Sequence, residues 1–504
     1  MTDRNTPTKN PVMRLGALSL LVVALAGCTL GPDYKRPASS LGGKFIGAGS
    51  SAVDATPTRA DITQFWRGFN DAALDGLIER ALAANNDVRL AQARLQEVRF
   101  NQGEADAAAR PGLAIDGGVT RSVTPITQRP GVSRSDRTGT VYDAGFIANW
   151  ELDLFGRYRR GSEAAAALVD ASQAGLHAAH TSVAAEVARN YLELRGLQQR
   201  LRIAEAGLVN QRDAFRISDA RFEAGRGTRL DRERAAALVA NTAAVVPLLQ
   251  NGIERTVFRI ATLVARPPAE VLAQLSAPAA LPGLPVTDLA RLPLGTPEQW
   301  LQRRPDLIAA ERQLAAATAT IGVAKTELFP RLSLTGLLGL NSASFSNLGR
   351  SESGVYSLGV GLNWTPFDLG AIRARIGATE ARAQQSLVNY EQAVALALEE
   401  TEGSLSSYSR SAQRAERQAV AVGHSREAAR LARERYSAGV SDLSVVLDAE
   451  RELLSSQDAL MQSQTTTATA LVGVYRALGG GWDAASVGPN GVVLSQGLGA
   501  KAGN

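Results

Sequence analysis

The sequence predicts a mixed fold in which long coiled-coil α-helices are joined to a few transmembrane β-strands within an internally duplicated chain. Three observations predict it: the second half repeats the first, apolar heptads run through two long segments, and four short segments alternate apolar and polar residues. Aromatic residues make up 5% of the 504 residues, which suits packed helices better than a thick globular core. The 54 basic and 49 acidic residues are nearly balanced, so we expect no nucleic-acid binding.

Residues 1–27 predict a secretory signal peptide, because basic residues precede an apolar stretch too short to span a bilayer. The stretch ends in Leu25-Ala26-Gly27-Cys28, which matches the bacterial lipobox, a motif whose cysteine is lipidated and becomes the first residue after cleavage. Cys28 is the only cysteine and stands where the motif requires one, so we favour a lipoprotein, with palmitate among its acyl chains, over an ordinary signal peptide. More than one acyl chain gives stable anchoring. Thr29 replaces the acidic residue that signals inner-membrane retention, which favours the outer membrane.

The duplication has an offset of about 214 residues. Asn149-Trp150 recurs as Asn363-Trp364, and with a few residues' slip Asn86-Asp87 matches Pro305-Asp306. A proline-rich connector separates the halves, so each half is expected to hold the same elements in the same order. The predicted regions are a signal peptide 1–27, a lipid-anchored N-terminal segment 28–86, a first repeat 87–265, a linker 266–305, a second repeat 306–478 and a C-terminal tail 479–504.

Each repeat is expected to contain a helix, two strands, a very long helix and a further helix. The predicted helices span about 87–109, 157–223 and 230–264 in the first repeat, and about 306–327, 371–437 and 443–478 in the second. Each long helix would extend ~100 Å at about 1.5 Å per residue. Apolar heptads run from Val187 to Phe222 and from Leu387 to Tyr436, and the two lines coincide under the offset. They predict a left-handed supercoil, although a plain coiled-coil rod would fit the helices equally well.

The strands argue against a plain rod. Four segments of about 8–12 residues alternate apolar and polar side chains, the length a tilted strand needs to cross a bilayer. They are 113–120, 142–152, 332–340 and 357–364. Trp150 and Trp364 end their segments, where the aromatic girdle of a membrane barrel would lie. A half-buried soluble sheet is the alternative.

Four strands cannot close into a barrel, and an open sheet edge is unstable in lipid. Outer-membrane barrels begin at eight strands, so two copies would supply eight and three copies twelve. The pattern alone leaves both open.

No set of residues predicts catalysis, a cofactor or a metal site. The three histidines, His177, His180 and His424, are interpreted as polar residues on helix surfaces rather than ligands. We therefore expect no enzyme, and no cofactor beyond the lipid on Cys28.

The lipobox followed by Gly31-Pro32-Asp33-Tyr34-Lys35-Arg36-Pro37, with the duplication, strand pairs and long helices, resembles the outer membrane factor family, specifically its TolC/OprM-type efflux lipoproteins of the NodT branch. The resemblance covers essentially the whole mature chain. It implies a homotrimer with a 12-stranded β-barrel in the outer membrane, and a twelve-helix tunnel of ~100 Å that extends into the periplasm. An equatorial belt would be built from the N-terminal segment, the tail and the linker.

By the same resemblance, the two helix–turn–helix tips would dock a periplasmic adaptor (membrane fusion) protein. The residues concerned are Gly225, Arg226 and Gly227 in the first tip, and Gly439, Val440 and Ser441 in the second. Glycine allows a sharp turn, so Gly225 and Gly439 could also serve only as helix caps.

The resemblance also implies a periplasmic gate. Asp231 and Tyr436 match positions that form a polar link between tips, and Asp448 matches an acidic ring position. Val445 stands where a second acidic residue would be, and Ser441 where a basic one would be, so an apolar constriction could replace part of the gate. Alternatively, Asp448 belongs to a solvated helix face.

The function that the resemblance implies is the exit duct of a tripartite multidrug efflux pump with an inner-membrane transporter of the resistance–nodulation–division (RND) type, a system that confers antibiotic resistance. The alternatives are a duct for type I protein secretion and, more remotely, a structural coiled-coil lipoprotein. We expect substrate selection to lie in the inner-membrane partner, because the duct itself is generic.

Overall fold

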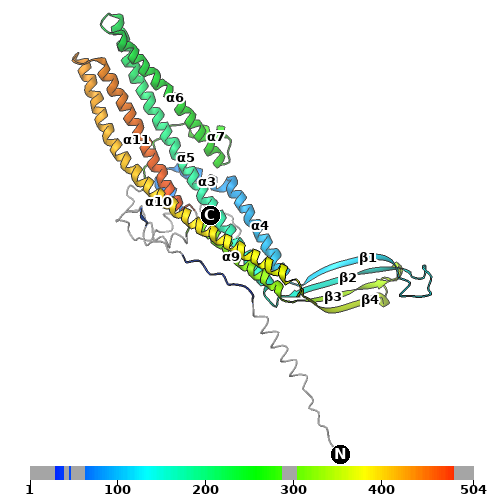
Figure 1. Ribbon diagram of the computed structural model, residues 1–504. Helices are drawn as coiled ribbons and strands as arrows, with labels where there is room; N and C mark the ends of the chain where they lie inside the picture. The colour runs from blue at the N-terminus through cyan, green and yellow to red at the C-terminus, as the bar shows by residue number, and fades with distance from the viewer. Residues whose placement is uncertain (1–28, 39–44, 47–62, 286–302, 482–504) are drawn as a thin grey trace, which may run out of the picture. The chain divides into compact units, whose positions relative to one another are not determined.

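The computed structural model describes residues 29–38, 45–46, 63–285 and 303–481 (Figure 1). The predicted signal peptide, the lipidation residue Cys28 and parts of the predicted linker and tail therefore lie outside the described residues. The chain forms two compact units, each of which draws on both repeats. We call them the strand unit (up to 37, 96–171 and 310–390) and the hairpin unit (38–95, 172–309 and from 391).

The strand unit contains a four-stranded antiparallel sheet in the order β1-β2-β3-β4 (Figure 1). The strands are β1 (Gly112–Val123), β2 (Thr138–Leu152), β3 (Arg331–Ser342) and β4 (Gly354–Asn363). All four predicted strands are confirmed. The central pair, β2 with β3, joins the first repeat to the second, and β1 and β4 are the edges of this sheet.

One face of the sheet carries a row of large apolar side chains. Ile115, Phe146, Leu338 and Tyr356 lie opposite one another across the four strands. Their exposed fractions run from 49% for Phe146 to 86% for Tyr356. This apolar face is therefore uncovered in the single chain.

Trp150 and Trp364 have equivalent contacts. The indole Nε1 of Trp150 donates to the carbonyl of Ala109, 3.0 Å away, and that of Trp364 donates to the carbonyl of Leu328, 3.2 Å away. Each acceptor lies just before the first strand of its repeat, so both indoles fix a helix-to-strand turn. Trp364 lies one residue beyond the end of β4.

The six predicted helices are confirmed to within about two residues at each end. They are α4 (Asn86–Ala108), α5 (Arg157–Glu223), α6 (Arg229–Leu263), α9 (Pro305–Lys325), α10 (Leu369–Ser437) and α11 (Leu443–Ala477). Two further helices, α3 (Ala72–Ala84) and α7 (Pro268–Leu275), were not predicted. Asp71 caps α3 by accepting from two backbone N–H groups, and α7 begins with Pro268, a favourable residue in a first helical turn.

In the hairpin unit, α5 with α6 and α10 with α11 form two long helical hairpins (Figure 1). The heptad residues Val187 and Leu194 are fully buried, and Tyr408 of the second line is 1% exposed. In the same unit, Phe65 stacks on Tyr475 with ring centroids 4.9 Å apart. Among the described helices, α6 alone is long and apolar enough to cross a membrane by composition, but a single such helix is weak support for a span.

Candidate functional site

The two hairpin tips have the same backbone turn. Gly225 (φ +69°) follows α5, and the N–H of Arg226 donates to the carbonyl of Arg221 at 2.8 Å. Gly439 (φ +73°) follows α10, and the N–H of Val440 donates to the carbonyl of Arg435 at 3.0 Å. Both are Schellman turns, which favour glycine because of the positive φ. The helix-cap role is therefore present, and the turns leave Arg226 and Val440 exposed.

Asp231 is engaged at the start of its own helix. Its Oδ2 accepts from the hydroxyl of Thr228 at 2.7 Å, while Thr228 Oγ1 accepts from the N–H of Asp231 at 3.1 Å. This reciprocal pair caps α6. Within the described part of this single chain, no hydrogen bond joins Asp231 to Tyr436.

Tyr436 instead bonds to Arg221 of the other hairpin. Arg221 Nη1 donates to the phenol oxygen at 2.5 Å, and the guanidinium lies 4.9 Å from the ring centroid. Arg221 was not among the predicted gate residues, although it is the duplicate of Arg435, the neighbour of Tyr436. Beneath this link, Ala235, Ala432, Leu443, Val446 and Leu447 form an apolar cluster that packs the two tips together.

The predicted gate positions on α11 are exposed in the single chain. Asp448 pairs with Arg451 one turn on at 2.9 Å, and its side chain is 65% exposed. Val445 is 49% exposed. Glu450, which was not among the predicted site residues, is 8% exposed and accepts from Arg433 of α10 at 2.8 Å. This ion pair fixes α11 on α10 just above the tip.

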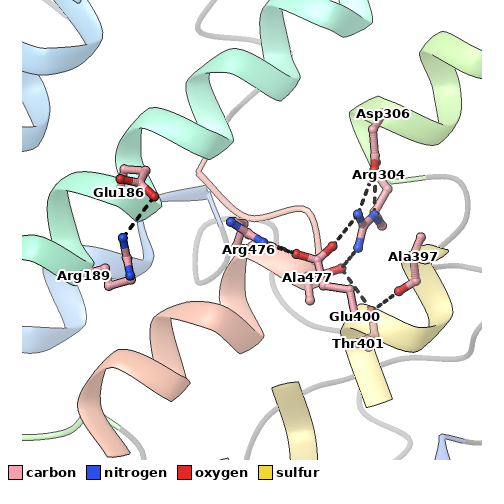
Figure 2. A network of polar contacts seen from close by, with 9 residues as sticks. All are labelled: Glu186, Arg189, Arg304, Asp306, Ala397, Glu400, Thr401, Arg476 and Ala477. Carbon is pink, nitrogen blue, oxygen red and sulfur yellow. Dashed lines mark hydrogen bonds and ion pairs between the residues drawn. The ribbon is translucent and has the colours of Figure 1, made fainter. Parts of the chain in front are cut away.

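A polar network fixes the opposite end of the second hairpin (Figure 2). The Arg304 side chain is 9% exposed and lies between Asp306 and Glu400, with Nη2 2.7 Å and 2.8 Å from their oxygens. Arg304 Nη1 donates to the carbonyl of Ala477, the last residue of α11, at 3.1 Å. Burial alone would raise the pKa of Glu400, but hydrogen bonds from Arg476 and Arg304 outweigh it and hold that pKa below its usual range.

The first repeat has the equivalent contact to the last carbonyl of its hairpin, but the donor is a neutral residue. Asn85 is 3% exposed, and its Nδ2 donates to the carbonyl of Leu263, the last residue of α6, at 2.9 Å. Leu263 and Ala477 are duplicates under the offset. Each repeat thus ties the start of a short helix to the end of its hairpin, once by an amide and once by a guanidinium.

The interpretation of the histidines as surface residues is wrong for two of the three. His177 and His180 are 9% and 4% exposed, because they lie on the packed side of α5. Burial lowers the pKa of each to about 4, and the neighbouring His180 adds to the effect on His177. His424 is exposed as expected. Among the described residues, no group of three or more possible ligands is placed to hold a metal ion.

The sequence and the structure of this chain are similar to those of known proteins over most of its length. The family model described as "Outer membrane efflux protein" matches residues 77–266 and 296–480. Nodulation protein T of Rhizobium leguminosarum bv. trifolii is 30% identical over 91% of this chain and 96% of its own length. Outer membrane protein OprJ of Pseudomonas aeruginosa is 32% identical over 94% of this chain and 97% of its own. The outer-membrane channel OprN superposes with a TM-score of 0.83 at 39% identity, covering 90% of this chain and 100% of OprN.

Proposed function

The chain belongs to the outer membrane efflux protein family, and from that premise we propose that it forms, as a homotrimer, the exit duct of a tripartite RND-type multidrug efflux pump. Its localisation is the outer membrane and its activity is that of an efflux channel, as for the family. The proposal adds the trimer, the lipid on Cys28, the periplasmic adaptor and the inner-membrane RND transporter. The main observation in support of the proposal is that one chain contains both an open four-stranded sheet and two long helical hairpins.

The sheet supports a trimer because it is incomplete alone. Its edges, β1 and β4, are unpaired among the described residues, and lipid cannot satisfy free backbone groups. Three copies would pair β4 of one with β1 of the next and close a twelve-stranded barrel. The exposed row of Ile115, Phe146, Leu338 and Tyr356 would then face lipid, with Trp150 and Trp364 near the interface.

The hairpins support the same assembly. Helix α6 leaves Leu230, Leu248 and Phe258 exposed by 58%, 69% and 44%. Such a face on a long helix needs a partner, and a neighbouring copy in a helical tunnel supplies one.

We assign adaptor docking to the two glycine turns and the entrance to the residues just inside them. The tips consist of Gly225, Arg226, Gly227, Gly439, Val440 and Ser441, of which Gly227 and Ser441 are half-buried and the others exposed, and their position at the hairpin ends supports docking. Asp231, Tyr436, Val445 and Asp448 lie within the first turns from the tips. In this proposal Arg221 joins Tyr436 in holding the hairpins together.

The test is a deletion strain with purified protein alongside. We expect the deletion to sensitise cells to several unrelated small toxicants, and the native mass in detergent to be that of a trimer. Unchanged tolerance together with a lost secreted protein would favour the type I secretion duct. A native monomer or dimer would contradict the proposed assembly.

A further inference from the structure

The apolar face of the sheet, identified above by its row of large side chains, carries a single charged residue. Side chains on one face recur at every second residue of a strand, and the register of the three strand pairs fixes which residues share a face. On the apolar face only Arg121 is charged, and it lies on β1 opposite Thr140 of β2. The other charged residues of the strands have the opposite parity and belong to the polar face: Asp116, Asp143, Glu151 and Arg331.

Arg121 lies near the end of the sheet that is away from α4 and α5 (Figure 1). At that end β1 and β2 are joined by residues 124–137, here called the β1–β2 loop. Trp150 is on the same face, ten residues along β2 from Thr140. That separation is ~34 Å along a strand at about 3.4 Å per residue, and ~25 Å across a bilayer for a strand tilted by about 40°. The apolar band of a membrane barrel has about this height, so Arg121 lies at the headgroup level opposite to that of the tryptophans.

Aromatic rings share this level with Arg121. Tyr142 is in the adjacent row of the same face, opposite Val119. Its ring meets that of Phe345 edge to face, with ring centroids 5.8 Å apart, and Phe345 is 72% exposed. Aromatic side chains at the ends of membrane strands lie at the boundary between hydrocarbon and headgroups. Tyr142 and Phe345 thus provide a second girdle at the end of the sheet where Arg121 lies.

The β1–β2 loop is ordered by its own polar contacts. Arg137 donates to the carbonyl of Thr124 at 2.7 Å and to that of Val132 at 3.1 Å. The N–H of Thr124 donates to the carbonyl of Arg137 at 2.8 Å, which extends the β1–β2 pairing by one step. Asp136, the one acidic residue of the loop, accepts from the Ser133 hydroxyl at 2.7 Å. The loop therefore uses its carboxylate and one of its arginines internally.

Three other arginines at this end keep their charges unpaired. The side chains of Arg121, Arg129 and Arg134 are exposed and have no hydrogen bond or ion pair within the part of the chain that the structure describes. A guanidinium on a lipid-facing surface extends its head to the headgroup level while its stem stays on apolar surface. Its fork of donors matches the oxygens of a phosphate group, which it binds by two parallel hydrogen bonds.

We propose that Arg121, with Arg129 and Arg134 of the β1–β2 loop, binds the phosphate groups of lipid A, the phosphorylated glycolipid of the outer leaflet. The inference rests on the proposed function, in which the sheet crosses the outer membrane and its helix end faces the periplasm. The β1–β2 loop then lies at the outer leaflet, beside these phosphates. The acyl chains of the same lipid lie against the apolar row, so one lipid molecule contacts the protein through both its headgroup and its chains.

The experiment is native mass spectrometry of the full-length protein, delipidated in detergent and titrated with lipid A that carries both phosphates. We expect the apparent Kd of Arg121→Gln to be at least about tenfold higher than that of the wild type, because a charged, bidentate contact is lost. Arg121→Lys keeps the charge without the planar fork and should fall between the two. Arg216→Gln is the matched control, because it removes an exposed arginine of α5 that pairs with Asp213, and it should bind as the wild type does.

A second variant tests the loop independently of the sheet. The double variant Arg129→Gln/Arg134→Gln changes only exposed loop side chains and should also weaken binding of lipid A, by a smaller factor than Arg121→Gln. Wild-type affinity in both Arg121→Gln and the double variant would overturn the inference.

The choice of lipid separates a phosphate site from a general affinity for acyl chains. Lipid A stripped of both phosphates should bind the wild type at least about tenfold more weakly, and Arg121→Gln should weaken it no further. Inorganic phosphate at an equal phosphate concentration should not displace lipid A, because only the lipid also contacts the apolar row. Equal binding of the two forms of lipid A, or displacement by inorganic phosphate, would overturn the assignment to a lipid.

The same spectra report the assembly, so the two proposals fail differently. A trimer that binds lipid A no better than its dephosphorylated form contradicts this inference alone. A monomer or dimer contradicts the proposed function, and this inference with it.

Discussion

Arg304 and Asn85 make equivalent contacts in the two repeats, Arg304 through a guanidinium and Asn85 through an amide. Each donates to the last carbonyl of a hairpin helix, yet the guanidinium brings a charge into a nearly buried position. Asp306 and Glu400 compensate that charge. The pairing of Arg304 with Glu400 could not be predicted from the sequence, because the two residues are far apart in the chain and nothing in the local pattern around Glu400 marks it as a partner. Such tertiary pairing is decided by packing rather than by periodicity.

We expect Arg304→Ala to lower the free energy of unfolding by about 1–3 kcal/mol, because it removes the hydrogen bonds of a side chain that is 9% exposed and leaves the Ala477 carbonyl and the partly buried Glu400 without that donor. Thermal melting of the purified protein measures this. Arg216→Ala removes an exposed pair with Asp213 and should cost under about 1 kcal/mol. Equal losses in the two variants would contradict a special role for the Arg304 network.

The burial of His180 was predictable from the heptad spacing. The heptad line through Val187 and Leu194 extends back by seven residues to His180, which places that side chain on the packed seam. Residue type alone favoured a surface position. Periodicity was the better guide, because burial follows the helix face and not the polarity of one side chain.

Stability should therefore fall in acid. The folded pKa of about 4 for His177 and His180 lies below the ordinary value of 6.5, so the unfolded chain binds more protons between these values. Their contribution is present above pH 6.5 and is lost as pH falls toward 4, at up to about 1.4 kcal/mol per pH unit for each histidine. Chemical unfolding at several pH values measures the slope. His180→Gln should flatten it, and His424→Gln, at an exposed position, should leave it unchanged.

At the scale of elements, the long helices and the strands were predictable because each has a period that no other structure shares. Seven-residue spacing specified α5 and α10, and alternation specified β1 to β4. The short helices α3 and α7 were not predicted, because α3 lies in a segment without heptads and α7 lies in a proline-rich stretch. In α7 the same Pro268 that suggested a linker begins the helix. The turn glycines were predicted from their residue type, but the hairpin-to-hairpin link from Arg221 was not.

We expect that link to restrain the entrance. Arg221→Ala removes a charged hydrogen bond and a ring contact together, worth about 1–3 kcal/mol, whereas Tyr436→Phe removes only the hydrogen bond. Single-channel conductance in planar bilayers should rise in both variants and rise further in Arg221→Ala. Arg216→Ala on the same helix serves as the control. Wild-type conductance in both link variants would remove Arg221 and Tyr436 from the gate.

At the scale of the whole molecule, the number of strands per chain was predictable but the number of copies was not. The alternation of a strand is the same in a barrel of eight or twelve strands, because it reports only lipid on one side and water on the other. The choice of three copies came from resemblance. The uncovered sheet face and the edges β1 and β4, unpaired among the described residues, support assembly of several copies without fixing their number.

The two sheet faces should respond differently to charge. Leu358 is 86% exposed on the apolar face, and Leu358→Arg would place a guanidinium in lipid at a cost of about 2–4 kcal/mol per copy. Thr335→Arg, on the polar face of the neighbouring strand, is the matched control and should assemble normally. The yield of trimer in outer-membrane fractions measures the difference. Equal yields would contradict a lipid-facing apolar row.

The pairing of β2 with β3 has an evolutionary consequence. It joins the last strand of one repeat to the first strand of the next, from Tyr142 opposite Ser342 to Leu152 opposite Leu332. The seam between copies in the proposed barrel repeats that relation, since β4 would meet β1. A half-length ancestor with two strands would then have closed the same ring as six identical subunits. In that scheme, gene fusion would turn every second subunit boundary into a covalent connection and leave the positions of Asn85 and Arg304 free to diverge.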